Sequence, residues 1–185
     1  FVQENPNQLR KNVASDAPEY APTVRILEVP DDDRIVGAVR AHLAQLHAAL
    51  VAGTVPPGKS GKVSVFVLGR YRRDVGYVPR CEDLSDRLDV RGATIHGSKG
   101  LEADYVVLPR IASGRGAFPS TRQDDPVLQL AMPEGDDHPH AEERRLFYVA
   151  LTRARRAVLL VSVEHRVSPF VIELVRDHDL KPVAV

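Results

Sequence analysis

Three almost unbroken apolar runs constrain the fold of this chain more than any other feature of its sequence. They span Val63–Leu68, Tyr105–Leu108 and Ala157–Val163. A strand with one face in water alternates apolar and polar residues, whereas a continuous apolar run is typical of a strand buried on both faces. Strands of that kind belong to parallel sheets covered by helices, so the runs favour an α/β fold.

The segments around these runs indicate helices and further strands. The acidic group Asp31–Asp33 precedes a segment with helical periodicity, which Gly53 ends, and acids are favoured in a first helical turn. Ser168 caps a last helix, and Pro169 occupies its first position. Strands are predicted at 24–29, 63–68, 93–95, 105–108 and 157–163, and helices at 35–50, 141–152 and 169–177. This alternation predicts one α/β domain over residues 1–185 with a mainly parallel sheet.

Residues 112–140 are rich in Gly, Pro, Asp and His and indicate a long irregular loop. Their acids and histidines, such as Asp124, Asp136 and His138, could suggest a metal site. A solvated loop explains them better, so we expect no metal site in this chain.

The composition excludes some classes of protein and leaves others open. The chain has 185 residues, with 25 basic and 25 acidic side chains, so any contact with DNA must come from a local patch of charge. The single cysteine, Cys81, excludes an internal disulfide. Together with the lack of a signal peptide or long apolar run, it favours the cytoplasm and no membrane partner. The start at Phe1 looks like the tail of a helix, so we expect a fragment of a longer protein.

Gly53–Ser60 fits the phosphate-binding pattern G-x-x-x-x-G-K-[ST] letter for letter. In a working P-loop the pattern lies between a strand and a helix, and backbone N–H groups hold the phosphates. Here a helical segment precedes the match and a strand follows it, while Pro56 and Pro57 remove two N–H donors. The sequence argues against a P-loop, although an ATPase that relies on Lys59 is an alternative.

Two other segments carry more specific patterns. Residues 93–108 indicate a strand, a Gly-rich turn and a second strand, with a histidine and a lysine in or beside the turn. We expect this turn at the carboxyl edge of the sheet, where open α/β folds bind ligands. Residues 142–155 place Arg153 where a helix gives way to a strand, so this arginine can project toward a neighbour's phosphate.

These two segments resemble motifs V and VI of the UvrD/Rep-type superfamily 1 helicases. The similarity extends to Ser168–Val171, and Val65–Arg70 looks like the segment that precedes motif V in that family. Only about twenty residues separate Arg73 from Thr94, where larger relatives insert a subdomain, so the chain resembles the helicase IV branch. The resemblance implies a RecA-like, P-loop-NTPase-type three-layer sandwich with a mainly parallel central sheet, the second motor domain of such an enzyme.

For the nucleotide side, the resemblance implies four residues. Arg153 matches the motif VI arginine finger, which reaches the γ-phosphate of ATP and neutralises charge developing on the transferred group. Glu102 matches the glutamate that contacts the ribose, Gly100 lies beside it in the motif, and Tyr148 matches a position that faces the nucleotide. The alternatives are a surface salt bridge for Arg153, a surface role for Glu102 and a core position for Tyr148.

For the DNA side, the resemblance implies five residues. Thr94, His96 and Ser98 match motif V positions that lie along single-stranded DNA. Lys99 could touch a phosphate or brace the turn, and Arg70 is a candidate for the DNA backbone. A packed histidine is the alternative for His96.

The same resemblance implies an ATP-dependent DNA helicase in the full-length protein. ATP and Mg²⁺ would be bound mainly by an N-terminal motor domain of the same chain, and single-stranded DNA would be the other partner. The fragment alone should therefore be inactive. The alternative is a catalytically silent DNA- or protein-binding module that kept the motor fold.

Overall fold

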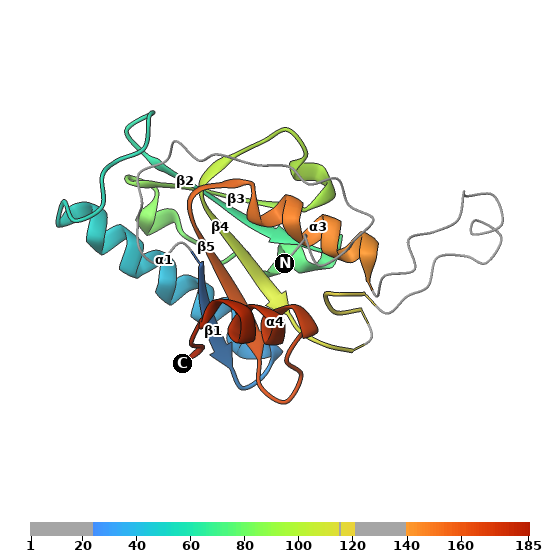
Figure 1. Ribbon diagram of the computed structural model, residues 1–185. Coiled ribbons are helices and arrows are strands. Elements are labelled where there is room, and N and C mark those ends of the chain that lie inside the picture. The colour runs from blue at the N-terminus through green and yellow to red at the C-terminus, as the bar shows by residue number, and fades with distance from the viewer. Residues whose placement is uncertain (1–23, 115, 121–139) are drawn as a thin grey trace.

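The chain forms a mainly parallel six-stranded sheet with helices on both faces (Figure 1). The computed structural model describes residues 24–114, 116–120 and 140–185. The strand order is β3-β2-β4-β5-β1-β6, and each neighbouring pair is parallel. The strands are β1 (Val24–Val29), β2 (Val63–Gly69), β3 (Leu88–Thr94), β4 (Ala103–Ile111), β5 (Ala154–Val163) and β6 (Val183–Ala184). The helices are α1 (Ile35–Val51), α3 (Ala141–Leu151) and α4 (Pro169–His178). Short 3-10 turns lie at η2 (Asp32–Arg34), η3 (Arg72–Tyr77), η4 (Glu82–Leu84) and η5 (His96–Ser98).

Two apolar cores, one on each face of the sheet, make the fold a three-layer sandwich. Helix α1 packs through residues such as Val39 and Leu43 on one face. Helices α3 and α4 pack through Phe147 and Phe170 on the other. Successive residues of β4 serve opposite cores, since Val106 belongs to the second and Val107 to the first. This alternation explains why the central strands are apolar without interruption, and it confirms the predicted α/β sandwich.

The helix ends follow the signals that the sequence carries. The Asp31 side chain accepts a hydrogen bond from Arg34 N at the turn that leads into α1. Ser168 Oγ accepts from Phe170 N, and Pro169 begins α4 as predicted. Both contacts satisfy N–H groups that have no partner within the helix.

Some boundaries differ from the sequence-based prediction. Strand β3 begins at Leu88 rather than at Ala93. The prediction missed its first half because Asp89 and Arg91 interrupt the apolar pattern of this edge strand. Strand β5 begins at Ala154, before its apolar run, and includes two arginines. The two-residue strand β6 was not predicted. The interpretation of residues 121–139 as a solvated loop lies outside the described residues.

Because the strands are parallel, the sheet has two distinct edges that matter for function. The carboxyl edge comprises the ends of the strands at Val29, Gly69, Thr94, Ile111 and Val163. The amino edge comprises the beginnings of the strands, among them Val63, Ala103 and Ala154.

Candidate functional site

The Gly-rich turn joins the two edges instead of lying at one. Strand β3 ends at the carboxyl edge with Thr94, which pairs with Gly69, whereas β4 begins at the amino edge with Ala103. Residues 95–102 therefore run back along the whole strand, a distance of about 20 Å at 3.3 Å per residue. The turn at Gly97–Gly100 was predicted at the carboxyl edge; the structure places its start there, whereas the residues after it, including Glu102, lead to the start of β4 at the amino edge.

At the amino edge, Arg153 lies between the end of α3 and the start of β5, as predicted. Its Nε donates to Val149 O at 3.0 Å, and its Nη1 donates to Leu101 O at 3.3 Å. The Val149 carbonyl is in the last turn of α3, where carbonyls have no partner within the helix and cations are favoured. These bonds hold the guanidinium between α3 and the turn while leaving it partly exposed.

Glu102 and Gly100 flank the carbonyl that receives Arg153. Both are exposed, and Gly100 has a φ of 80°, in the left-handed region that favours glycine. Leu101 between them is 51% exposed, which is unusual for a large apolar side chain. Tyr148, one turn before the end of α3, is half-buried. The structure thus brings Arg153, Gly100 and Glu102 together at the amino edge.

A β-bulge lies beside Arg153 at the start of β5. Ala103 pairs with Ala154 and Tyr105 with Ala157, so Arg155 and Arg156 both face Asp104. Arg155 Nη2 donates to Asp104 Oδ1 at 3.2 Å, and Arg156 Nε lies 3.5 Å from the same oxygen. The other oxygen, Oδ2, accepts from Ser64 N and Ser64 Oγ, both at 2.9 Å. Burial alone would raise the pKa of Asp104, but these bonds from Ser64 and the two arginines hold it below its ordinary value.

Positive charge accumulates at the amino edge although the chain is neutral. Segments 58–64, 100–104 and 152–157 contain five cations and two carboxylates. The cations are Lys59, Lys62, Arg153, Arg155 and Arg156, and the carboxylates are Glu102 and Asp104. A local excess of this kind attracts an anionic ligand.

At the carboxyl edge, the turn uses its hydroxyl groups internally. Thr94 Oγ1 accepts from Gly97 N at 3.1 Å, and Ser98 Oγ donates to Ile95 O at 2.7 Å. Ser98 is fully buried, so its side chain offers no surface to DNA in this structure. His96 is exposed on η5, and Lys99 is exposed just after it. Of the motif V residues predicted to bind DNA, His96 and Lys99 have the most accessible side chains.

Arg70, the other DNA candidate, is held in an ion pair. Its Nε and Nη2 donate to Glu143 Oε1 at 3.0 and 2.7 Å, and Glu143 also accepts from Ser120 N. Burial would lower the pKa of Arg70, but the bond and charge of Glu143 raise it. The pair joins the end of β2 to α3, and it leaves Arg70 little capacity for a DNA phosphate.

Comparison with known proteins places these motifs in a family. Residues 81–165, which include both motif segments and Arg153, match the UvrD-like helicase C-terminal domain. This segment is a UvrD-like helicase C-terminal domain. The chain is 31% identical over 185 residues to DNA helicase IV of Escherichia coli (strain K12), covering 100% of this chain and 24% of that protein.

Other relatives of the helicase domain are similar over shorter stretches. A probable DNA helicase of Mycoplasma pneumoniae is 41% identical over 70 residues, covering 38% of this chain and 11% of that protein. The crystal structure of the C-terminal domain of a possible DNA helicase from Lactobacillus plantarum WCFS1 has a TM-score of 0.52 at 17% identity, covering 88% of this chain and 84% of that one. The last similarity supports the fold, and the chain spans about a quarter or less of the curated relatives' length.

The P-loop-like segment Gly53–Ser60 follows helix α1 and precedes strand β2. This is the predicted order, and it is the reverse of the strand–loop–helix order of a P-loop. The glycine before Lys59 has a structural reason: a Cβ at Gly58 would lie 2.1 Å from Lys62 O and 2.9 Å from Asp104 Oδ2. Arg156 donates to Pro56 O and Pro57 O at 2.6 and 2.8 Å, so these carbonyls hold a protein side chain. Packing therefore explains the pattern.

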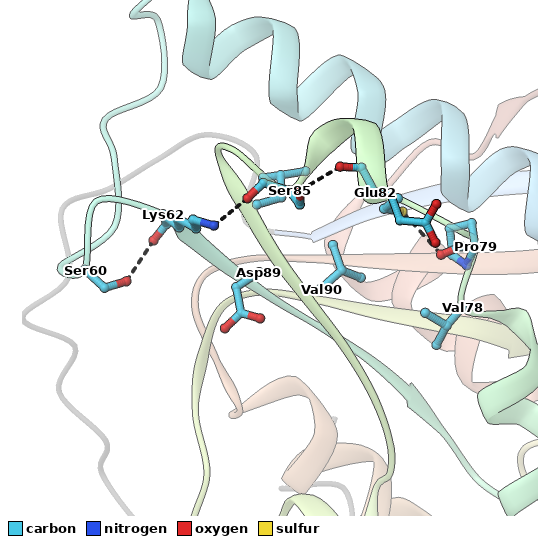
Figure 2. Close-up of a pocket in the computed structure, with 10 residues that line it drawn as sticks. Ser60, Lys62, Val78, Pro79, Glu82, Ser85, Asp89 and Val90 are labelled. Carbon is cyan, nitrogen blue, oxygen red and sulfur yellow. Dashed lines mark hydrogen bonds between the residues drawn. The ribbon is translucent and has the colours of Figure 1, made fainter.

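A groove beside the edge strand β3 is separate from both candidate sites. Its volume is about 540 Å³, and Figure 2 shows Lys62 donating to the Ser85 carbonyl across it. None of the residues predicted for ATP or DNA lines this groove. Burial raises the pKa of the Cys81 thiol in its wall, which makes that thiol less reactive.

The sequence analysis missed the Asp104 network of the helicase domain. No role was predicted from the sequence for Asp104, Arg155 or Arg156. A charged residue directly before the apolar run of β4 was the available signal, since a buried carboxylate needs partners. In the described part of the chain, no three His, Cys, Asp or Glu side chains gather as a metal site, and no helix is long and apolar enough to cross a bilayer.

Proposed function

We propose that this domain is the second motor domain of an ATP-dependent single-stranded-DNA translocase or helicase. Its amino edge would face ATP held by the first motor domain, and its carboxyl edge would face DNA. The observation that carries the proposal is the position of Arg153, which is held by neutral carbonyls beside the exposed Glu102.

In this proposal Arg153 acts as the arginine finger. Its hydrogen-bond partners in the described chain are the Val149 and Leu101 carbonyls and the Thr152 hydroxyl, so no carboxylate there neutralises it. An arginine that keeps its charge can stabilise the charge that develops on a transferred phosphoryl group. Glu102, one residue after the Leu101 carbonyl, would accept a hydrogen bond from the ribose.

The residues at the amino edge fit a nucleotide. The excess of cations suits a triphosphate, and the exposed Leu101 offers an apolar surface close to the finger. Mg²⁺ and the P-loop would be supplied by the first motor domain. Bound there, Mg²⁺ would neutralise negative charge on the phosphates, and Arg153 would add a positive charge toward the transferred group.

The carboxyl edge would contact single-stranded DNA through His96 and Lys99. Closing and opening of the two motor domains around ATP would move this edge along the strand by a hinge-type motion. The domain contributes few aromatic side chains, so its contacts would be mainly to the backbone of the strand.

ATP hydrolysis tests the proposal. The 185-residue chain alone, with Mg²⁺ and with or without single-stranded DNA, should show no turnover, and the full-length protein should show DNA-stimulated turnover. ATP turnover by the 185-residue chain alone would contradict the proposal that this domain only completes an ATP site held by the first motor domain. A full-length protein with neither ATP hydrolysis nor a P-loop upstream would favour a silent binding module.

A further inference from the structure

The Asp104 carboxylate has a position that the proposed reaction does not use directly. It is 4% exposed, and it lies on β4 two residues after Glu102. It receives hydrogen bonds from Ser64 of β2 and from Arg155 of β5, so it connects the three strands at their amino ends. A carboxylate this buried is costly unless it is paired, which indicates that the network is specifically built.

The bulge in β5 explains how one carboxylate holds two arginines. In a regular strand Arg155 and Arg156 would point to opposite faces, and Asp104 could meet only one of them. The extra residue places both opposite Asp104. Bulges alter the direction of the strand and of nearby side chains, and they are frequent next to active sites. Arg153 is two residues before this bulge, in the segment whose direction the bulge sets.

Arg156 extends the network to the segment between α1 and β2. Its Nη1 and Nη2 donate to the Pro56 and Pro57 carbonyls, and its side chain is only 13% exposed. The same arginine therefore contacts the bulge, the carboxylate and this segment. The amino ends of β2, β4 and β5 and the P-loop-like segment form one hydrogen-bonded unit.

We propose that Asp104 is a positioning residue for Arg153, because it clamps the Arg155–Arg156 bulge that fixes the start of β5. The inference rests on the proposed function of Arg153 as the finger. Asp104 touches neither nucleotide nor DNA in this scheme and acts through the backbone of β5. Without its charge, Arg155 and Arg156 repel each other and the bulge relaxes. A shift of about 1 Å at a catalytic group can cost about 10²-fold in rate.

The test uses Asp104→Asn in the full-length protein, with steady-state ATP hydrolysis at saturating single-stranded DNA. We expect kcat to fall about 10- to 100-fold, because asparagine is nearly isosteric with aspartate but lacks the charge that holds both arginines. DNA affinity without nucleotide should change less than twofold. Asp89→Asn is the matched control, because among the described residues Asp89 pairs only with the exposed Arg91 on β3, and the variant should keep wild-type kcat. Wild-type kcat in Asp104→Asn would overturn the proposal.

A double variant separates positioning from a general structural defect. If Asp104 acts through the finger, adding Asp104→Asn to Arg153→Ala should lower kcat no further than Arg153→Ala alone. Multiplicative losses would overturn the positioning role. Wild-type kcat in Arg153→Ala would instead overturn the proposed function of the finger, so the two failures are distinguishable.

A milder variant covers the case in which Asp104→Asn does not fold. Arg155→Gln removes one arm of the clamp and keeps the bonds between Ser64 and Asp104, and the Arg155 side chain is 37% exposed. We expect a three- to tenfold lower kcat with an unchanged melting temperature, and partial recovery in Arg155→Lys. An unchanged kcat in Arg155→Gln would count against the clamp.

Discussion

The two edges of the sheet hold the arginines predicted to bind ligands in opposite ways. At the amino edge, Arg153 donates to the neutral carbonyls of Val149 and Leu101 and keeps its full charge. At the carboxyl edge, Arg70 is paired with Glu143, and Arg110 is paired with Asp32. The arginine predicted for ATP is therefore free to meet an anion, whereas the arginine predicted for DNA is neutralised within the domain.

This difference has a consequence for how such domains bind nucleotides. Open α/β folds that bind a ligand alone do so at the carboxyl ends of their strands. In our proposal this helicase domain meets ATP at its amino edge, which suits a domain that completes a site whose phosphates are held elsewhere. A free guanidinium is what such a domain must deliver, and a guanidinium paired with its own carboxylate could not do so.

The largest effect should follow the loss of the unpaired charge. Arg153→Ala in the full-length protein should lower kcat for DNA-stimulated ATP hydrolysis about 10³-fold or more, since a finger is worth on the order of 10³–10⁵ in rate. Binding of single-stranded DNA without nucleotide should be unchanged. Arg91→Ala, which removes an exposed arginine from β3, is the control and should have wild-type activity. A kcat within threefold of wild type in Arg153→Ala would remove the distinction between the edges.

The second effect concerns stability at the carboxyl edge. Arg70→Ala should destabilise the 185-residue chain by about 2–4 kcal/mol, because it leaves the buried Glu143 without its partner. Chemical denaturation measures the change in the free energy of unfolding. The control is Arg72→Ala at a nearby exposed arginine, which should lower that free energy by less than about 0.5 kcal/mol. If Arg70→Ala instead weakens DNA binding and leaves stability intact, Arg70 is a DNA contact and the edges are more alike than we propose.

A smaller effect is expected from the exposed part of the carboxyl edge. His96→Ala in the full-length protein should weaken binding of single-stranded DNA about three- to tenfold, equivalent to about 1 kcal/mol, as for the loss of one contact to the strand. The KM for ATP should stay within twofold of wild type. Ser98→Ala is the comparison, because Ser98 is buried and should alter stability rather than affinity. Equal losses of affinity in both variants would mean that the turn acts through its shape, not through His96.

Periodicity was sufficient to predict most of the fold, but edges and pairings were harder. The runs at Val63–Leu68 and Ala157–Val163 gave the buried strands because both faces of the sheet are covered. Strand β3 was predicted too short because an edge strand tolerates charge, such as that of Asp89. The turn was assigned to one edge because spacing alone does not show how far a connection must travel to reach the next parallel strand.

The candidate site shows a similar division between local and long-range information. Arg153 could be placed from sequence, since the junction of helix and strand is a local feature. Asp104 could not, because its partners Ser64 and Arg155 are 40 and 51 residues away. The bulge that brings Arg155 and Arg156 to it depends on strand register, which the pattern of residues does not reveal.

The smallest effect should come from the residue that most resembles a nucleotide ligand. Lys59→Ala in the full-length protein should change kcat and KM for ATP less than twofold, even though Lys59 lies in a phosphate-binding pattern. Close packing against Lys62 O and Asp104 requires Gly58, and Arg156 occupies the Pro56 and Pro57 carbonyls, so both pattern features have structural causes.

Lys62→Ala provides the comparison for this last prediction, because Lys62 donates to the Ser85 carbonyl and should affect stability alone. A large loss of turnover in Lys59→Ala, with normal stability, would show that the amino edge holds phosphates itself. The domain would then bind ATP phosphates through its own Lys59. It would no longer be a domain that only completes an ATP site held by another domain. Wild-type turnover would instead leave Arg153 as the cation that distinguishes this edge.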